Sequence, residues 1–366
     1  MPSSRSKPTF DTLFSLLIFA ALPFIAQAAD HPWQIASQDG KSSIAFGFLA
    51  QGQAEWFTNP LSKTTSQNLF LRRIRLIAGG QINDKLSFFI ETDSPNLGKG
   101  QADGTKVAGN VYLQDVIFTY KFRTEFQLDG GLLFVPVSHN GTQGATTLLP
   151  VDYGPYSFLA SDPTDSRVGR DYGLQARGYL FNKHIEYRAG VYQGRRNPNA
   201  NDSFRYTGRL VWYPFESDTN FFYTGTTLGT KKILALGTSY DNQGDYHAQT
   251  VDLFYDQPLF KGDGLTVQAD FTHYNGGTTF LQLPPQQTWM SEAGYYFHHV
   301  KIGPFMQLSG ERFSQITGKN QSKYLGGLAW WPEGHKFNVK LGMGQAKAGS
   351  DPRRIQAVIQ TQFYIY

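Results

Sequence analysis

The chain has 366 residues, of which 15% are aromatic and 17% are charged, and it contains 38 glycines and no cysteine. Its formal net charge of +4 is too small to indicate nucleic-acid binding, and the lack of cysteine excludes disulfides and thiol chemistry. Average soluble proteins are about a quarter charged, so this composition favours many alternating strands over a helical enzyme.

The N-terminus has the pattern of a secretory signal peptide. Arg5 and Lys7 precede an apolar run, Leu13 to Ile25, which ends at a small-residue cleavage site, Ala26-Gln27-Ala28. The run of roughly 13 residues is shorter than the ~20 that a membrane-spanning helix needs, so a signal peptide is favoured over a membrane anchor. We predict a signal peptide at residues 1–28.

Regular alternation of apolar and polar side chains begins at Ser43, after a segment at 29–42 that we expect to be short and periplasmic. Runs with one apolar and one polar face lie, for example, at 44–57, 185–191, 265–271 and 336–343. Repeated runs of about ten such residues are typical of transmembrane barrel strands, which turn apolar side chains to lipid and polar ones to the lumen. A soluble sandwich is the alternative, but it does not require strands so uniformly long or so many aromatic strand ends.

Connection lengths predict how the strands are arranged. Short links, such as Asn83-Asp84, alternate with long polar ones, such as 94–109, as periplasmic turns and external loops do in a barrel. Seventeen runs can be counted, but bacterial single-chain barrels have an even number. The weakest run, Phe221 to Leu228, is therefore placed at the periplasmic rim. We predict an all-β, transmembrane antiparallel β-barrel of sixteen strands at residues 43–366.

The longest link, residues 138–170, follows the fifth strand. It carries apolar side chains that do not suit a mobile external tail, including Leu148, Leu149, Tyr153 and Phe158. Loops of this length are usually functional when they are ordered. We expect this loop to fold into the lumen as a constriction, and the alternative is a cap packed over the mouth.

Three arginines lie close together in the stretch 70–93, "FLRRIRLIAGGQINDKLSFFIETD". If the apolar side chains around them face lipid, Arg73 and Arg75 face the lumen, whereas Arg72 has lipid parity and would reach headgroups near the outer mouth. A charge facing lipid at mid-depth costs roughly 2–4 kcal/mol. The arginines are therefore expected to line an aqueous passage.

Other basic residues share this lumen parity: Arg177, Arg188, Arg205, Arg209, Lys336 and Lys340. A basic lining attracts anions, and guanidinium groups match phosphate and carboxylate oxygens. The alternative is that these residues pair with acids of the same face, which gives a balanced, weakly selective pore. The candidate acids are Glu55, Glu91, Asp93, Asp115, Glu186, Asp252, Asp270, Glu292 and Glu311.

Five stretches, 70–93, 130–141, 169–194, 204–215 and 234–259, occur in the order found in a known family. On these stretches the chain resembles the phosphate-selective porin O and P family. The resemblance implies a sixteen-stranded, usually trimeric outer-membrane channel that admits anions past an infolded loop. It also implies that Arg72, Arg73 and Arg75 form the family's arginine cluster, and that Arg167 and Arg170 lie at the end of the constriction loop.

Two features depart from the family pattern. In the fifth strand, Phe134 occupies the position at which the family commonly has a lysine. The long loop region carries four carboxylates: Asp152, Asp162, Asp165 and Asp171. A lost cation and added carboxylates weaken the case for phosphate over other anions.

The combined prediction is a bacterial outer-membrane porin for passive diffusion of small hydrophilic solutes, with a preference for anions that include phosphate or other oxyanions. A weakly selective general porin and a plugged structural or adhesive barrel without conductance remain alternatives. No G-x-S-x-G elbow or metal-ligand spacing is present, so no enzyme, metal or cofactor is predicted. The expected partners are small anions, outer-membrane lipid, a homotrimer and the barrel-assembly machinery, which would recognise the C-terminal strand ending in Tyr366.

Overall fold

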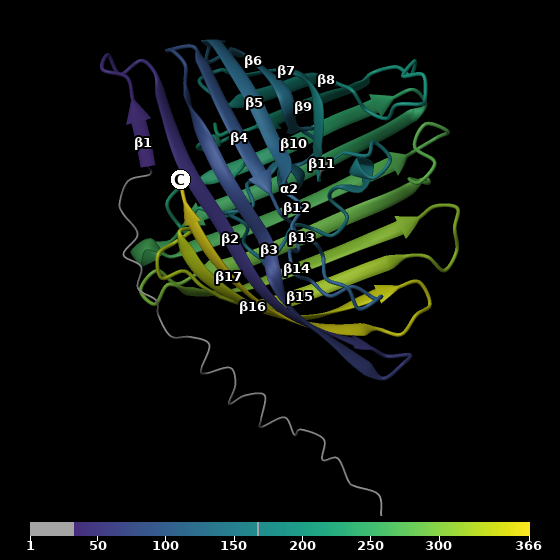
Figure 1. The fold of residues 1–366 in the computed structure, drawn as a ribbon. Helices are drawn as coiled ribbons and strands as arrows, with labels where there is room; N and C mark the ends of the chain where they lie inside the picture. Colours follow the sequence, from purple (N-terminus) through teal and green to yellow (C-terminus); the bar gives the residue numbers. More distant parts are fainter. Residues whose placement is uncertain (1–32, 167) are drawn as a thin grey trace, which may run out of the picture. The chain divides into compact units, whose positions relative to one another are not determined.

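A computed structural model describes residues 33–166 and 168–366 of the chain, so the predicted signal peptide and Arg167 lie outside the described residues. The chain forms a ring of sixteen antiparallel strands in which each strand pairs with the next along the sequence and β17 closes the ring against β2 (Figure 1). The predicted sixteen-stranded barrel is confirmed. None of the helices in these residues is long and apolar enough to cross a membrane.

The strands of the ring follow one another along the sequence. They are β2 (Ser43–Asn59), β3 (Thr64–Gln81), β4 (Leu86–Asp93), β5 (Tyr112–Arg123), β6 (Phe126–Phe134), β7 (Arg170–Leu180), β8 (Ile185–Tyr192), β9 (Arg205–Trp212), β10 (Ile233–Gln243), β11 (Tyr246–Pro258), β12 (Gly264–Asn275), β13 (Gln286–Tyr296), β14 (Ile302–Phe313), β15 (Gln321–Trp330), β16 (Phe337–Ala348) and β17 (Arg354–Ile365). Three short helical turns occur between strands: α2 (His139–Thr142), η1 (Leu159–Ser161) and η2 (Phe260–Gly262).

A further short strand, β1 (Trp33–Ala36), lies outside the ring. It pairs antiparallel with the start of β2, where Trp33 lies opposite Phe46. The pairing of β17 with β2 reaches Phe48, so β1 continues along the β2 edge where β17 stops. This pairing satisfies backbone groups that an open sheet edge would leave without partners.

Burial along the strands follows the period of two that the sequence predicts. In β9, Arg209 is buried on the inner face, whereas the next residue, Leu210, is 55% exposed on the outer face. Val251 of β11 is 57% exposed, and its neighbour Asp252 is buried. Successive side chains of a strand point to opposite faces, so the ring has an apolar outer surface and a polar, charged lining.

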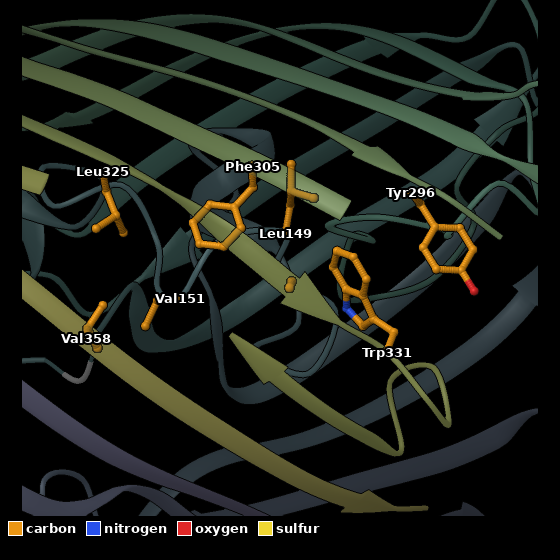
Figure 2. Packing of buried hydrophobic residues seen from close by; sticks show 8 residues of the cluster. Leu149, Val151, Tyr296, Phe305, Leu325, Trp331 and Val358 are labelled. Carbon is orange, nitrogen blue, oxygen red and sulfur yellow. The ribbon is translucent and has the colours of Figure 1, made fainter. Parts of the chain in front are cut away.

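The long loop folds into the barrel. Its residues Leu149 and Val151 pack in a buried cluster against Phe305, Leu325 and Val358 of the barrel wall (Figure 2). Tyr296, Ala329 and Trp331 complete this cluster. Burial of apolar side chains against the inner wall fixes the loop inside the barrel, so the predicted infolding is confirmed.

Backbone carbonyl groups of the same loop bind polar side chains of several strands. Gln362 of β17 donates to the Thr146 carbonyl at 2.9 Å, and Lys340 of β16 donates to the Pro150 carbonyl at 2.9 Å. Gln307 of β14 donates to the Asp152 carbonyl at 3.1 Å. The loop thus crosses the lumen rather than capping its mouth.

Residues 213–232, between β9 and β10, contain no strand, in agreement with the count of sixteen. The predicted place of residues 221–228 at the periplasmic rim is wrong, because Tyr223 lies against the infolded loop. The Gly144 N–H donates to the Tyr223 carbonyl at 2.9 Å, and the Tyr223 N–H donates to the Thr142 carbonyl at 3.0 Å. The Tyr223 ring also stacks on His139 with a centroid distance of 4.8 Å. The barrel therefore has two infolded segments that support each other.

Candidate functional site

The arginine cluster of β3 begins at a β-bulge. Gln51 of β2 lies opposite Arg73, but the next residue, Gly52, lies opposite Leu71, so Arg72 is the extra residue. A bulge interrupts the alternation of faces. Arg72 consequently turns inward and contacts the loop, and the expectation that it faces lipid is wrong.

Asp152 of the infolded loop lies at the centre of this cluster. Its Oδ2 accepts from Nε and Nη2 of Arg72 at 2.9 and 2.7 Å, and its Oδ1 accepts from Nη2 of Arg73 at 2.6 Å. The Tyr153 N–H also donates to Oδ1 at 3.0 Å. Burial would raise the pKa of Asp152, but the two guanidinium groups lower that pKa well below its usual value. Both carboxylate oxygens are thus held by cations.

A second group of charges lies next to this cluster. Arg75 contacts Glu91 at 2.8 Å and Asp93 at 3.0 Å. Arg170 contacts Asp115 at 2.9 Å, and its guanidinium lies 3.5 Å from the ring centroid of Phe134. Phe134, which replaces the family's lysine, therefore binds a cation instead of supplying one.

The other predicted arginines are also paired with acids of the barrel wall. The pairs are Arg177 with Asp129 at 2.8 Å, Arg188 with Glu186 at 2.6 Å, Arg205 with Asp241 at 2.5 Å and Arg209 with Asp252 at 2.6 Å. All four arginines are buried. The contacts of these four arginines therefore agree with the alternative prediction, in which basic residues of the lumen face pair with acids of the same face.

The predicted lysines have different positions. Lys340 is buried and donates to carbonyl groups of the infolded loop, including that of Pro150. Lys336 is exposed in the turn before β16, so its predicted place on the lumen wall is wrong. Alternation along the strand does not orient Lys336, because β16 begins one residue later, at Phe337.

The Arg209–Asp252 pair spans β10, because its partners lie on β9 and β11. A Cβ on the intervening Gly237 would lie 2.5 Å from Asp252 Oδ1 and 2.6 Å from Arg209 Nη2. We expect Gly237→Ala to displace the ion pair and to lower the free energy of unfolding by about 1–3 kcal/mol. Urea unfolding in detergent micelles measures this effect. Gly208→Ala on β9 is the control, because its Cβ would meet nothing within 4 Å, and an equal loss in both variants would contradict the explanation.

Two cations missing from the predicted site extend the arginine cluster. Lys99 contacts Glu55 at 2.6 Å, and Lys323, on the inner face of β15, interacts electrostatically with Asp152, Glu55, Arg72 and Lys99. We call this set the mouth cluster: it contains the cations Arg72, Arg73, Lys99 and Lys323 and the carboxylates Glu55 and Asp152. Four cations against two carboxylates leave an excess of two positive charges. The alternation of side chains along β15 could have placed Lys323 on the lumen face. No such pattern could have placed Lys99, because it lies in the irregular link between β4 and β5.

Acids without ion pairs occupy another part of the lining. Asp270 of β12, Glu292 of β13 and Glu311 of β14 have no Lys, Arg or His nitrogen within 4 Å in the described ranges. Glu292 accepts from Gln307 at 3.1 Å. The lining thus has an excess of cations at the mouth cluster and carboxyl groups without cationic partners along β12–β14.

Two histidines, the buried His139 and the half-buried His335, hold the infolded segment 213–232. Nε2 of His139 lies 2.9 Å from the Thr224 carbonyl oxygen, and Nε2 of His335 lies 3.0 Å from the Thr226 carbonyl oxygen. Nδ1 of each ring has no hydrogen-bond partner in the part of the chain that the structure describes. Burial lowers the pKa of both rings to about 4. Both rings are therefore neutral at pH 7 and donate from Nε2.

Acid is expected to release segment 213–232. Burial in the bound segment disfavours the charged form of both rings, so the bound segment keeps a histidine pKa of about 4 while the released state returns to about 6.5. The stabilisation is complete above about pH 6.5 and is lost as the pH falls toward 4, by roughly 3 kcal/mol for each histidine. Hydrogen exchange of residues 213–232 measures the release.

The double variant His139→Gln/His335→Gln is the control for this prediction. Its amide groups retain an N–H donor but do not titrate in this range, so the protection factors of residues 213–232, which correct exchange for its intrinsic pH dependence, should no longer depend on pH. Equal protection factors at about pH 7 and about pH 5 in the unmodified protein would contradict the role of the histidines.

The fold is similar to solved outer-membrane proteins. OmpF of Salmonella typhi, in a complex with daunomycin, aligns with a TM-score of 0.63 at 14% identity over 90% of this chain and 100% of that chain. An anion-selective porin from Comamonas acidovorans aligns with a TM-score of 0.61 at 10% identity over 89% and 100%. OprB of Pseudomonas putida aligns with a TM-score of 0.57 at 10% identity over 88% and 92%. A comparison with curated proteins finds no match.

A closed sixteen-stranded barrel with an apolar outer face, a charged lining and an infolded loop defines an outer-membrane porin. The family model for "Phosphate-selective porin O and P" matches residues 51–280, which is more than half of the chain. The protein belongs to the phosphate-selective porin O and P family.

Proposed function

We propose that this porin passes small hydrophilic solutes by passive diffusion and prefers anions, with phosphate and other oxyanions as candidate solutes. The mouth cluster is the observation that supports this preference, because it has an excess of two positive charges. Its Arg72 and Asp152 side chains are 22% and 34% exposed, so the cluster is accessible to a solute. Positive charge at a constriction concentrates anions and excludes cations.

The acids of β12–β14 favour a second candidate, a weakly selective porin. Where they are ionised, Asp270, Glu292 and Glu311 offset the mouth cluster if the solute path runs along them. The pairing of the remaining arginines also leaves little net charge at their positions on the inner wall. A third candidate, a plugged barrel, is favoured by the loop that crosses the lumen.

Planar-bilayer recording in a KCl gradient separates these candidates. We expect a steady current with a reversal potential of anion-selective sign. A reversal potential near zero would favour the weakly selective porin, and a cation-selective sign would refute the anion preference. The absence of any steady current would favour the plugged barrel.

Lys323→Gln tests whether the mouth cluster sets the preference. Lys323 forms no ion pair within 4 Å among the described residues, so the change removes one positive charge without leaving a carboxylate unpaired. We expect a shift of the reversal potential toward zero with little change in conductance. Lys336→Gln removes the same charge from an exposed turn and should have no effect. Equal shifts in both variants would exclude a specific role of the mouth cluster.

We also propose how the chain reaches its site. Residues 1–28 would direct export and be removed, residues 29–42 would remain periplasmic, and the C-terminal strand would be recognised by the barrel-assembly machinery. The chain would assemble as a homotrimer in outer-membrane lipid, which is usual in the family. Chemical cross-linking of the protein in native outer membranes tests the trimer.

A further inference from the structure

Asp152 binds the arginines as a free oxyanion would. Its two oxygens accept three hydrogen bonds from Arg72 and Arg73, which is the charge-assisted contact that guanidinium groups make with carboxylates and phosphates. The carboxylate belongs to the loop, however, and not to a solute. The arginines that are best placed to bind an anion are therefore already occupied.

The loop holds this carboxylate in place. The Asp152 carbonyl accepts from Gln307 of β14, and the next residue, Tyr153, is buried with its ring 5.6 Å from the Arg73 guanidinium. Arg73 also donates from Nη1 to Gln51 at 2.7 Å. The backbone on both sides of the carboxylate is thus anchored to the wall.

Exposure shows which group a solute meets first. The Asp152 side chain is 34% exposed, whereas the Arg73 side chain is 3% exposed. A solute anion in the lumen therefore reaches Asp152 before it reaches Arg73. Lys323 lies near the same carboxylate and leaves the surroundings positive.

We propose that Asp152 is a built-in competitor that occupies the arginine site, and that a free oxyanion binds Arg72, Arg73 and Lys323 only when the Asp152 side chain turns away. This inference rests on the proposed function and names what limits anion binding at the same site. A group tethered beside its partner acts at an effective concentration of millimolar or more. Free phosphate at lower concentration is consequently displaced, and the channel passes anions without retaining them.

Asp152→Asn tests the proposal with inorganic phosphate as the probe. Asparagine keeps the acceptor for the Tyr153 N–H but loses the charge that holds the arginines. We expect phosphate to block the chloride current of the variant at a concentration about tenfold lower than in the unmodified protein. Asp162→Asn is the matched control, since Asp162 lies on the same loop, is exposed, and forms no side-chain ion pair in the described ranges.

The outcomes separate this inference from the proposed function. If the unmodified protein is anion-selective but both variants show the same phosphate block as it does, Asp152 is no competitor. If Asp162→Asn lowers the blocking concentration as much as Asp152→Asn does, the effect is one of general charge and the inference is also wrong. A cation-selective reversal potential in the unmodified protein refutes the proposed function instead.

Gel electrophoresis with and without heating shows whether Asp152→Asn folds. A second variant is used if it does not. Asp152→Ser retains a small acceptor beside Tyr153 and also removes the charge. It should lower the blocking concentration of phosphate by the same factor, and an unchanged block in this folded variant would overturn the proposal.

Discussion

Replacing residues 144–160 with a short glycine-serine linker should raise the single-channel conductance several-fold. These residues cross the lumen, contacting β14, β16 and β17 through the Asp152, Pro150 and Thr146 carbonyl groups. Other ion pairs of the wall remain, because Arg75 and Arg170 keep their acids on β4 and β5. Arg72 and Arg73 lose Asp152 with the removed residues. The measurement is the step size of single channels in a planar bilayer.

A matched control shortens a different link. Residues 315–320, between β14 and β15, are exposed and do not enter the buried loop cluster. Their shortening should leave the conductance unchanged. If removal of residues 144–160 also leaves it unchanged, closure of the lumen must be assigned to segment 213–232, whose release by acid can then be measured in the same variant.

Asp252→Asn is expected to lower the free energy of unfolding by about 3–5 kcal/mol, because it leaves a buried guanidinium without its counter-charge. Both side chains of the Arg209–Asp252 pair are completely buried, and two hydrogen bonds of 2.6 and 2.8 Å join them. Asp270 lies opposite Asp252 in the sheet. Relief of this like-charge contact offsets a fraction of the loss.

Urea unfolding in detergent micelles, read by tryptophan fluorescence, measures this effect. Glu311→Gln is the control, because Glu311 is buried to a similar degree but has no ion pair among the described residues. The double variant Arg209→Met/Asp252→Leu should recover most of the lost stability, since it removes both charges together. A loss of less than about 1 kcal/mol in Asp252→Asn would show that water reaches the pair.

The arginine pairs explain how a barrel without disulfides keeps its shape. Arg177–Asp129, Arg205–Asp241 and Arg209–Asp252 each join two different strands. Ion pairs of this kind satisfy buried charges that would otherwise be costly. The pairing leaves these three arginines without free charge, whereas the mouth cluster keeps an excess of positive charge in the described part of the chain.

The period of two in stretches such as 185–191 was sufficient to predict the barrel. This signal is local, because each strand must show apolar side chains to lipid along its whole length. The apolar residues of the long loop predicted its infolding for a similar reason, since Leu148 and Leu149 are stable only when buried. The arginine-rich stretch could also be assigned to the lumen, because lipid excludes charge.

The partners of these arginines depended on tertiary structure. Arg209 meets Asp252 across an intervening strand, and Asp152 meets Arg72 and Arg73 after a loop has crossed the barrel. The bulge at Arg72 depends on the register between β2 and β3. Sequence alone therefore determined which residues of the regular strands face the lumen, through the alternation of strand faces. It did not determine the positions of Arg72 at the bulge and Lys336 in the turn before β16. Only the tertiary structure decided which of those charges neutralise one another, because ion pairing depends on distances between segments that are far apart in the chain.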